Sequence, residues 1–83
     1  MFKIKLTARA RKELKNLSKI HRLSVGHILE DLKDNPFVGK PLTRELMRRY
    51  SYRIGVYRII YKVNKTDNII YVLTVGHRSN VYQ

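Results

Sequence analysis

The sequence lacks the residues with which many small proteins cross-link themselves. It contains no cysteine and no tryptophan among its 83 residues. Without cysteine, neither a disulfide nor a thiolate zinc site can form. His21 and His27 are six positions apart and no carboxylate completes a ligand set, so we expect no metal and no cofactor. The length fits one small apolar core, and we expect residues 1–83 to form a single domain.

Long hydrophobic runs are also missing. A membrane-spanning helix needs about 18 or more apolar residues in succession, and the chain has no such stretch. The first six residues, Met1 to Leu6, alternate apolar and basic side chains, whereas a signal peptide needs a continuous apolar segment. We therefore expect no membrane partner and a cytoplasmic location, with which the absence of cysteine agrees.

Acidic residues are scarce, and the charge is strongly one-sided. Eighteen Lys and Arg against six Asp and Glu give a net charge of +12, above the magnitude of about 2–8 that suits a small soluble domain. Such a surplus repels itself and indicates a polyanion or an acidic partner. Beyond Glu45 the only acid is Asp67, against the bases Arg48, Arg49, Arg53, Arg58, Lys62, Lys65 and Arg78. The C-terminal half is thus expected to face the anion, unless the whole surface is basic without a specific ligand.

Two amphipathic helices are expected in the first half. Residues 2–6 alternate as a strand does, and Thr7 is a suitable helix N-cap. Apolar residues then recur at helical spacing in two stretches, first Ala10, Leu14 and Leu17, then Val25, Ile28, Leu29 and Leu32. The first stretch predicts about three helical turns. The second helix should end at Asn35-Pro36, because a residue before proline avoids the helical region.

Strands dominate the second half. Residues 36–45 contain two prolines and a glycine and are expected to form a loop. Three runs rich in Val, Ile and Tyr then follow, at about residues 47–54, 56–63 and 69–76. Gly55 predicts a tight hairpin between the first two. The fold class is therefore α+β with the order β-α-α-β-β-β: a mostly antiparallel sheet with a helical hairpin on one face and the other face open to a ligand.

Alternation along the strands separates a basic face from an apolar one. Arg49, Ser51 and Arg53 share one face of the first run, opposite Tyr50, Tyr52 and Ile54. In the next run Val56, Arg58, Ile60 and Lys62 share a side. Arg49, Arg53 and Arg58 could converge on one sheet face, where their planar guanidinium groups would suit phosphate. Alternatively they only solvate the exposed side of a half-buried sheet.

Histidine, arginine and tyrosine are concentrated after the last run. The segment from Gly76 to Gln83 includes His77, Arg78 and Tyr82. His77 titrates near neutral pH and could move a proton, or it could make a structural hydrogen bond. The tyrosines of the chain could stack on RNA bases, or fill the core of the sheet.

Several of these segments together resemble the RelE/ParE toxin superfamily of type II toxin–antitoxin systems. The resemblance rests on the run from Tyr52 to Tyr61 (YRIGVYRIIY) and on Gly76-His77-Arg78 followed by Val81-Tyr82. Leu6-Thr7-x-x-Ala10, Leu32-x-x-Asn35-Pro36 and the order of elements also fit. The resemblance covers nearly the whole chain.

The resemblance implies a toxin that cleaves mRNA in the ribosomal A site without a metal. The 2′-hydroxyl attacks the adjacent phosphate and leaves a 2′,3′-cyclic phosphate and a 5′-hydroxyl. By motif position, the expected catalytic residues are Arg58, Arg78, Tyr82 and Arg49, and the expected RNA contacts are Arg53, Ser51, Lys62 and His77. Arg58 would stabilise the phosphate, Arg78 would stabilise charge or protonate the leaving oxygen, and Tyr82 would pack on the cleaved nucleotide.

The sequence departs from the family pattern at Ser51, and the superfamily includes a second type of toxin. Ser51 stands where some RelE members carry a lysine implicated in proton transfer; Arg49 or His77 could substitute, although arginine is a poor general base. ParE-like members share the fold but poison DNA gyrase. We favour the RelE-like nuclease because Arg58, Arg78 and Tyr82 are all present. The expected partners are the ribosome, mRNA and a cognate antitoxin, with which the chain would form a hetero-oligomer.

Overall fold

The computed structural model describes residues 1–41 and 49–77. Over these residues the chain forms two helices and five strands. In chain order they are β1 (Lys3–Leu6), α1 (Ala8–Lys15), α2 (Lys19–Asp34), β2 (Lys40–Pro41), β3 (Arg49–Ile54), β4 (Tyr57–Asn64) and β5 (Ile69–His77). The fold is α+β, as the switch from helical to alternating periodicity predicts. Neither helix is long and apolar enough to cross a membrane within the part of the chain that is described.

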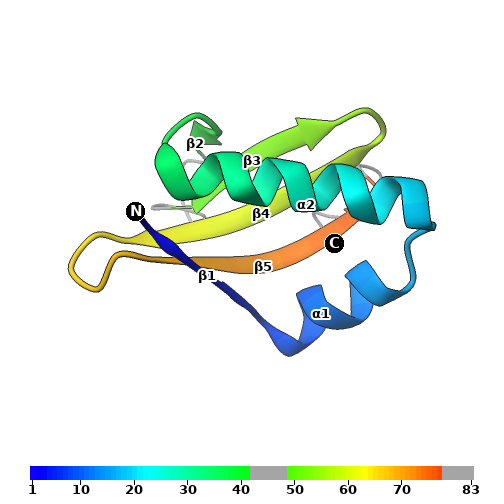
Figure 1. Cartoon of the computed structure of the whole chain (residues 1–83), viewed down its shortest axis with the longest axis horizontal. Helices are drawn as coiled ribbons and strands as arrows, with labels where there is room; N and C mark the ends of the chain where they lie inside the picture. The colour runs from blue at the N-terminus through cyan, green and yellow to red at the C-terminus, as the bar shows by residue number, and fades with distance from the viewer. Residues whose placement is uncertain (42–48, 78–83) are drawn as a thin grey trace.

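The strands form one sheet in the order β1-β5-β4-β3-β2. Every neighbouring pair is antiparallel except β1 and β5, which run parallel. Helix α2 crosses one face of this sheet, and α1 lies beside β5 near the end of β1 (Figure 1). The predicted mostly antiparallel sheet with paired helices is therefore confirmed.

The core lies between the helices and one sheet face. Its buried members come from both helices and the central strands: Ala10, Val25, Leu32, Ile59, Tyr61, Ile70, Val72 and Val75. Tyr50 and Tyr52 pack against this cluster, as the alternation of β3 predicts. The opposite sheet face, which carries the basic residues, is the one that the helices leave uncovered.

Helix α1 is shorter than the apolar spacing predicts. Thr7 is its N-cap and accepts a hydrogen bond from the Ala10 amide, as expected, but the helix ends at Lys15. Leu17 lies beyond the helix and still packs against the core. The cause is Ser18, which caps the start of α2 at once and forces the chain to turn before it.

A short strand interrupts the loop predicted over residues 36–45. Strand β2 pairs antiparallel with β3, with Lys40 opposite Ser51 and Pro41 opposite Tyr50. The prediction of a loop is therefore wrong at these two positions, and the rest of the predicted loop from residue 42 lies outside the described residues. Proline is tolerated here because β2 is an edge strand, where one side needs no ladder hydrogen bond.

The hairpin between β3 and β4 sets the register of the basic face. Gly55 turns the chain with a φ of 56°, which glycine adopts without the strain of a side chain. Ile54 then pairs with Tyr57, and Arg53 with Arg58. The predicted hairpin is thus confirmed, and it fixes which side chains face one another.

A glutamate of α1 completes the free edge of β5. Beyond Val72, β5 no longer pairs with β1. The Oε1 atom of Glu13 instead accepts hydrogen bonds from the Thr74 hydroxyl, at 2.7 Å, and from the Val75 amide, at 3.0 Å. An acidic side chain in a strongly basic protein therefore joins α1 to the end of β5, next to the strand position that faces Arg58.

Candidate nucleic-acid interface

Cross-strand pairing collects the basic side chains on the uncovered sheet face. Residues directly opposite on neighbouring strands share a face. One row across the sheet consists of Arg53, Arg58 and Gly76, and the next of Lys40, Ser51, Ile60 and Thr74. A third row consists of Arg49, Lys62, Tyr71 and Lys5. The face therefore carries cationic side chains from four of the five strands.

The row nearest the hairpin places two arginines side by side. Arg53 is exposed and Arg58 is half-buried, and they are direct partners across β3 and β4. Like charges opposite one another destabilise a sheet. A bound anion would offset this repulsion, and guanidinium groups present planar forks of donors that match phosphate.

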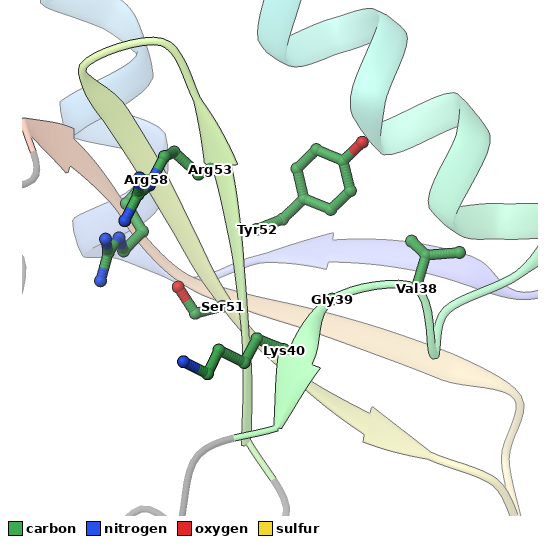
Figure 2. Close-up of a pocket in the computed structure, with 7 residues that line it drawn as sticks. All are labelled: Val38, Gly39, Lys40, Ser51, Tyr52, Arg53 and Arg58. Carbon is green, nitrogen blue, oxygen red and sulfur yellow. The ribbon is translucent and has the colours of Figure 1, made fainter.

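A pocket of about 400 Å³ lies at this pair. Its lining consists of Val38, Gly39, Lys40, Ser51, Tyr52, Arg53 and Arg58. Figure 2 shows the polar ends of Lys40, Ser51, Arg53 and Arg58 on one side of β3, whereas the ring of Tyr52 points to the other side. Three cations and a hydroxyl thus border one space, a set of groups that suits a phosphate.

The expected site residues divide into four groups. Arg53, Arg58 and Ser51 line the pocket together. Arg49 and Lys62 face each other on the same sheet face, one row further from the hairpin, and do not line it. His77 ends β5 and pairs with Tyr57. Arg78 and Tyr82 lie outside the described residues.

Lys40 is the pocket residue that the sequence did not reveal. It follows Pro36 and Gly39 in a segment with the composition of a loop, and strand alternation cannot be followed through it. Its position depends on pairing with β3, a contact distant in sequence. The only local signal is a basic residue directly before a proline.

The tyrosines fall mainly on the core side. Tyr50 and Tyr61 stack with ring centroids 5.5 Å apart, and both belong to the face that the helices cover. Tyr71 instead lies half-buried in the basic row with Lys62 and Lys5. The core interpretation therefore applies to Tyr50, Tyr52 and Tyr61, whereas Tyr71, among residues 1–41 and 49–77, is placed on the basic face where it could meet a base.

The described residues include no cluster of side chains that could bind a metal ion. Residues 1–41 and 49–77 contain no group of three or more His, Asp or Glu side chains that could hold an ion. The charge of the pocket comes from arginine and lysine. Such a site can stabilise negative charge by electrostatics and hydrogen bonding alone.

The fold and this face define a class of protein: a small α+β domain with a basic face on its sheet. The family model described as the ParE toxin of type II toxin–antitoxin systems matches residues 4–82, nearly the whole chain. The chain belongs to this family, within the RelE/ParE superfamily, and is a RelE-like toxin of a type II toxin–antitoxin system.

Relatives named as Rel toxins cover the full length. Toxin RelG of Mycobacterium tuberculosis is 34% identical over 99% of this chain and 97% of its own length. Toxin RelE of the same organism is 30% identical over 99% of this chain and 87% of its own length. The toxin–antitoxin complex RelBE2 from M. tuberculosis superimposes with a TM-score of 0.85 at 34% identity, covering 93% of this chain and 98% of the other. The family resemblance expected from the motifs is therefore confirmed.

Proposed function

We propose that this toxin is a metal-independent endoribonuclease that cleaves mRNA on the ribosome and so inhibits translation. The observation that carries the proposal is the facing pair Arg53 and Arg58 beside a pocket that Lys40 and Ser51 also line. The similarity to toxins named RelE and RelG supports it. Residues 1–83 act in this proposal as one domain without a cofactor.

The reaction depends on stabilising the negative charge that develops on the phosphate in the transition state. The 2′-oxygen loses its proton to water and forms a bond to phosphorus, and the bond from phosphorus to the 5′-oxygen breaks as that oxygen gains a proton. The phosphorane carries more negative charge than the starting phosphate. Arg58 and Arg53 favour it because a guanidinium holds its charge at every relevant pH and donates two parallel hydrogen bonds.

The other expected residues take roles around this pair. Arg49 and Lys62 lie two rows away on the same sheet face and would contact flanking phosphates of the RNA. In the proposed mechanism Arg78 stabilises or protonates the leaving oxygen, Tyr82 packs on the cleaved nucleotide, and His77 contacts the RNA. Ser51 contributes a hydroxyl and no charge, so the basic groups around it must supply the electrostatics.

A cognate antitoxin is the second proposed partner. The related RelBE2 toxin was solved in complex with its antitoxin. Here Ile20 and Leu23 on α2 are 75% and 59% exposed, and Val56 in the β3–β4 turn is 51% exposed. Exposed apolar residues on a basic surface suit an acidic, amphipathic segment, which would give a hetero-oligomer.

DNA gyrase is the alternative target, and the ParE name of the matching family model favours keeping it. Two parallel assays of the purified protein separate the targets. One incubates it with translating ribosomes and maps RNA 5′ ends; the other measures supercoiling by gyrase. Cleavage at codons in the A site with unaffected gyrase is the expected result. Inhibited gyrase with intact mRNA would reject the nuclease in favour of the alternative.

A further inference from the structure

Lys40 occupies a defined position in the pocket although it lies on an edge strand. It pairs directly with Ser51, which is 9% exposed, and Ser51 pairs in turn with Ile60. Figure 2 shows the Lys40 amine on the same side of β3 as the Ser51 hydroxyl and the guanidinium groups of Arg53 and Arg58. The ammonium group therefore lies at the end of the pocket where Ser51 contributes no charge.

The segment that carries Lys40 is fastened to the core by one hydroxyl. The Tyr61 hydroxyl donates to the Pro36 carbonyl at 2.7 Å and accepts from the Gly39 amide at 3.1 Å. Tyr61 is fully buried, and this burial raises its pKa to about 12. The phenol thus keeps its proton at neutral pH and continues to donate.

Close packing fixes the same segment from two sides. A Cβ atom on Gly39 would collide with the Tyr61 hydroxyl, so the backbone lies directly against that group. The Phe37 ring packs edge-on against Tyr50, with centroids 5.8 Å apart, and Tyr50 stacks on Tyr61. Residues 36–40 are therefore held before any ligand arrives, and Lys40 starts from a fixed backbone.

Lys40 differs from the two arginines in the shape and flexibility of its charged group. An ammonium is a compact charge with three donors on a flexible stem, so it can follow a phosphate oxygen as the geometry changes. Ser51, directly opposite, has no charge to contribute at that end of the pocket. Lys40 is the cation that the described lining offers there.

We propose that Lys40 is a phosphate-contacting residue of the cleavage site, which binds a non-bridging oxygen of the scissile phosphate opposite Arg53 and Arg58, and that Tyr61 is its positioning residue. The inference rests on the proposed endoribonuclease function. It assigns to the β2 edge the charge that Ser51 lacks.

Single-turnover cleavage on ribosomes programmed with mRNA tests this assignment. Lys40→Met should lower the rate by about 10²-fold, the order expected for loss of one charge-stabilising donor. Lys40→Arg should retain most of the rate. Lys12→Met, which removes an exposed lysine from α1, is the matched control and should behave as the wild type. Equal rates for Lys40→Met and wild type would overturn the role of Lys40.

A second-site rescue tests the geometry itself. Since Lys40 and Ser51 are direct cross-strand partners, Ser51→Lys in the Lys40→Met background returns an ammonium to the same end of the pocket. This double variant should recover at least tenfold of the lost rate. Lack of recovery, together with an unchanged fold by circular dichroism, would contradict the proposed position.

A binding measurement tests the phosphate contact of Lys40 without requiring cleavage of the mRNA. Ribosomes carrying mRNA with a 2′-deoxy nucleotide at the cleavage site cannot be cut, so affinity can be followed against salt. Lys40→Met should reduce the slope of log affinity against log salt by about 0.7, the value for one phosphate contact. If wild type fails to cleave, the proposed function falls, and the salt slope alone then decides whether Lys40 contacts phosphate; an unchanged slope rejects it.

Discussion

At the scale of single residues, a buried tyrosine holds the backbone beside the pocket. Tyr61 belongs to the core, yet its hydroxyl holds the Pro36 carbonyl and the Gly39 amide, two backbone groups next to the pocket. Tyr61 lies on the side of β4 opposite Arg58 and Lys62, and it belongs to the core cluster. Its hydrogen bonds could not be predicted, because they join residues 22 and 25 positions apart.

Removing this hydroxyl should cost stability. Tyr61→Phe keeps the ring and its stacking on Tyr50 but leaves the Gly39 amide and the Pro36 carbonyl without a partner. Leaving a buried polar group unsatisfied costs about 1–3 kcal/mol, so the free energy of unfolding should fall by that order. Urea denaturation measures it. Tyr71→Phe on the half-buried basic face is the control and should change little.

The same residue predicts a decline of stability at alkaline pH. The folded pKa of Tyr61, about 12, exceeds the ordinary value of 10.0. The unfolded chain therefore loses this proton first as pH rises, and unfolding becomes easier between about pH 10 and 12. Below pH 10 the ionisation of Tyr61 should add no pH dependence to the free energy of unfolding. Urea midpoints measured across that window should decline less in Tyr61→Phe than in wild type; parallel curves for the two proteins would contradict the assignment.

At the scale of elements, long-range contacts explain what the sequence pattern predicted incompletely. The two helices and the three long strands follow from apolar periodicity. The early end of α1 follows from the cap at Ser18, a local signal that prevailed over the apolar spacing. Strand β2 exists because β3 pairs with it, and a segment with proline and glycine carries no strand pattern of its own.

The contact between α1 and β5 should be a main determinant of stability. Glu13→Ala leaves the Val75 amide and the Thr74 hydroxyl without their acceptor at a partly buried edge. We expect a loss of about 1–3 kcal/mol in the free energy of unfolding. Glu30→Ala is the matched control, because Glu30 makes a helical ion pair with Lys33 while its own side chain is 70% exposed. That pair is worth about 0.5 kcal/mol or less. Equal losses in urea denaturation would remove Glu13 from this role.

At the scale of the whole molecule, part of the net charge of +12 is arranged in rows on one face of the sheet. Cross-strand register turns scattered Arg and Lys positions into rows on one sheet face, as the alternation of β3 and β4 predicts. Lys40, Tyr71 and Lys5 could be assigned to this face only from the order of the strands in the sheet. Strands β1 and β2 are its two edges, and their places cannot be predicted from alternation alone. Family motifs predict a phosphate-binding site, and strand pairing determines which side chains share this sheet face.

Binding to ribosomes should therefore depend strongly on salt. Three phosphate contacts, from Lys40, Arg53 and Arg58, would give a slope of log affinity against log salt of about −2 for single-stranded RNA. Additional contacts from Arg49 and Lys62 would make it steeper. Fluorescence titration at several salt concentrations measures the slope. An affinity that does not change with salt would argue against phosphate contacts and favour a protein target.

Arg58 stabilises the transition state of mRNA cleavage in the proposed mechanism, and a comparison of wild type with Arg58→Ala tests this role. Translated mRNA is incubated with wild type and with Arg58→Ala, its 5′ ends are mapped, and single-turnover rates and ribosome affinities are measured on the same samples. Arg11→Ala, an exposed arginine of α1, serves as the control. We predict cleavage in the A site by wild type and control, and a rate about 10²–10³-fold lower for Arg58→Ala with little loss of affinity. Equal cleavage by wild type and Arg58→Ala, or intact mRNA with wild type, would contradict the claim.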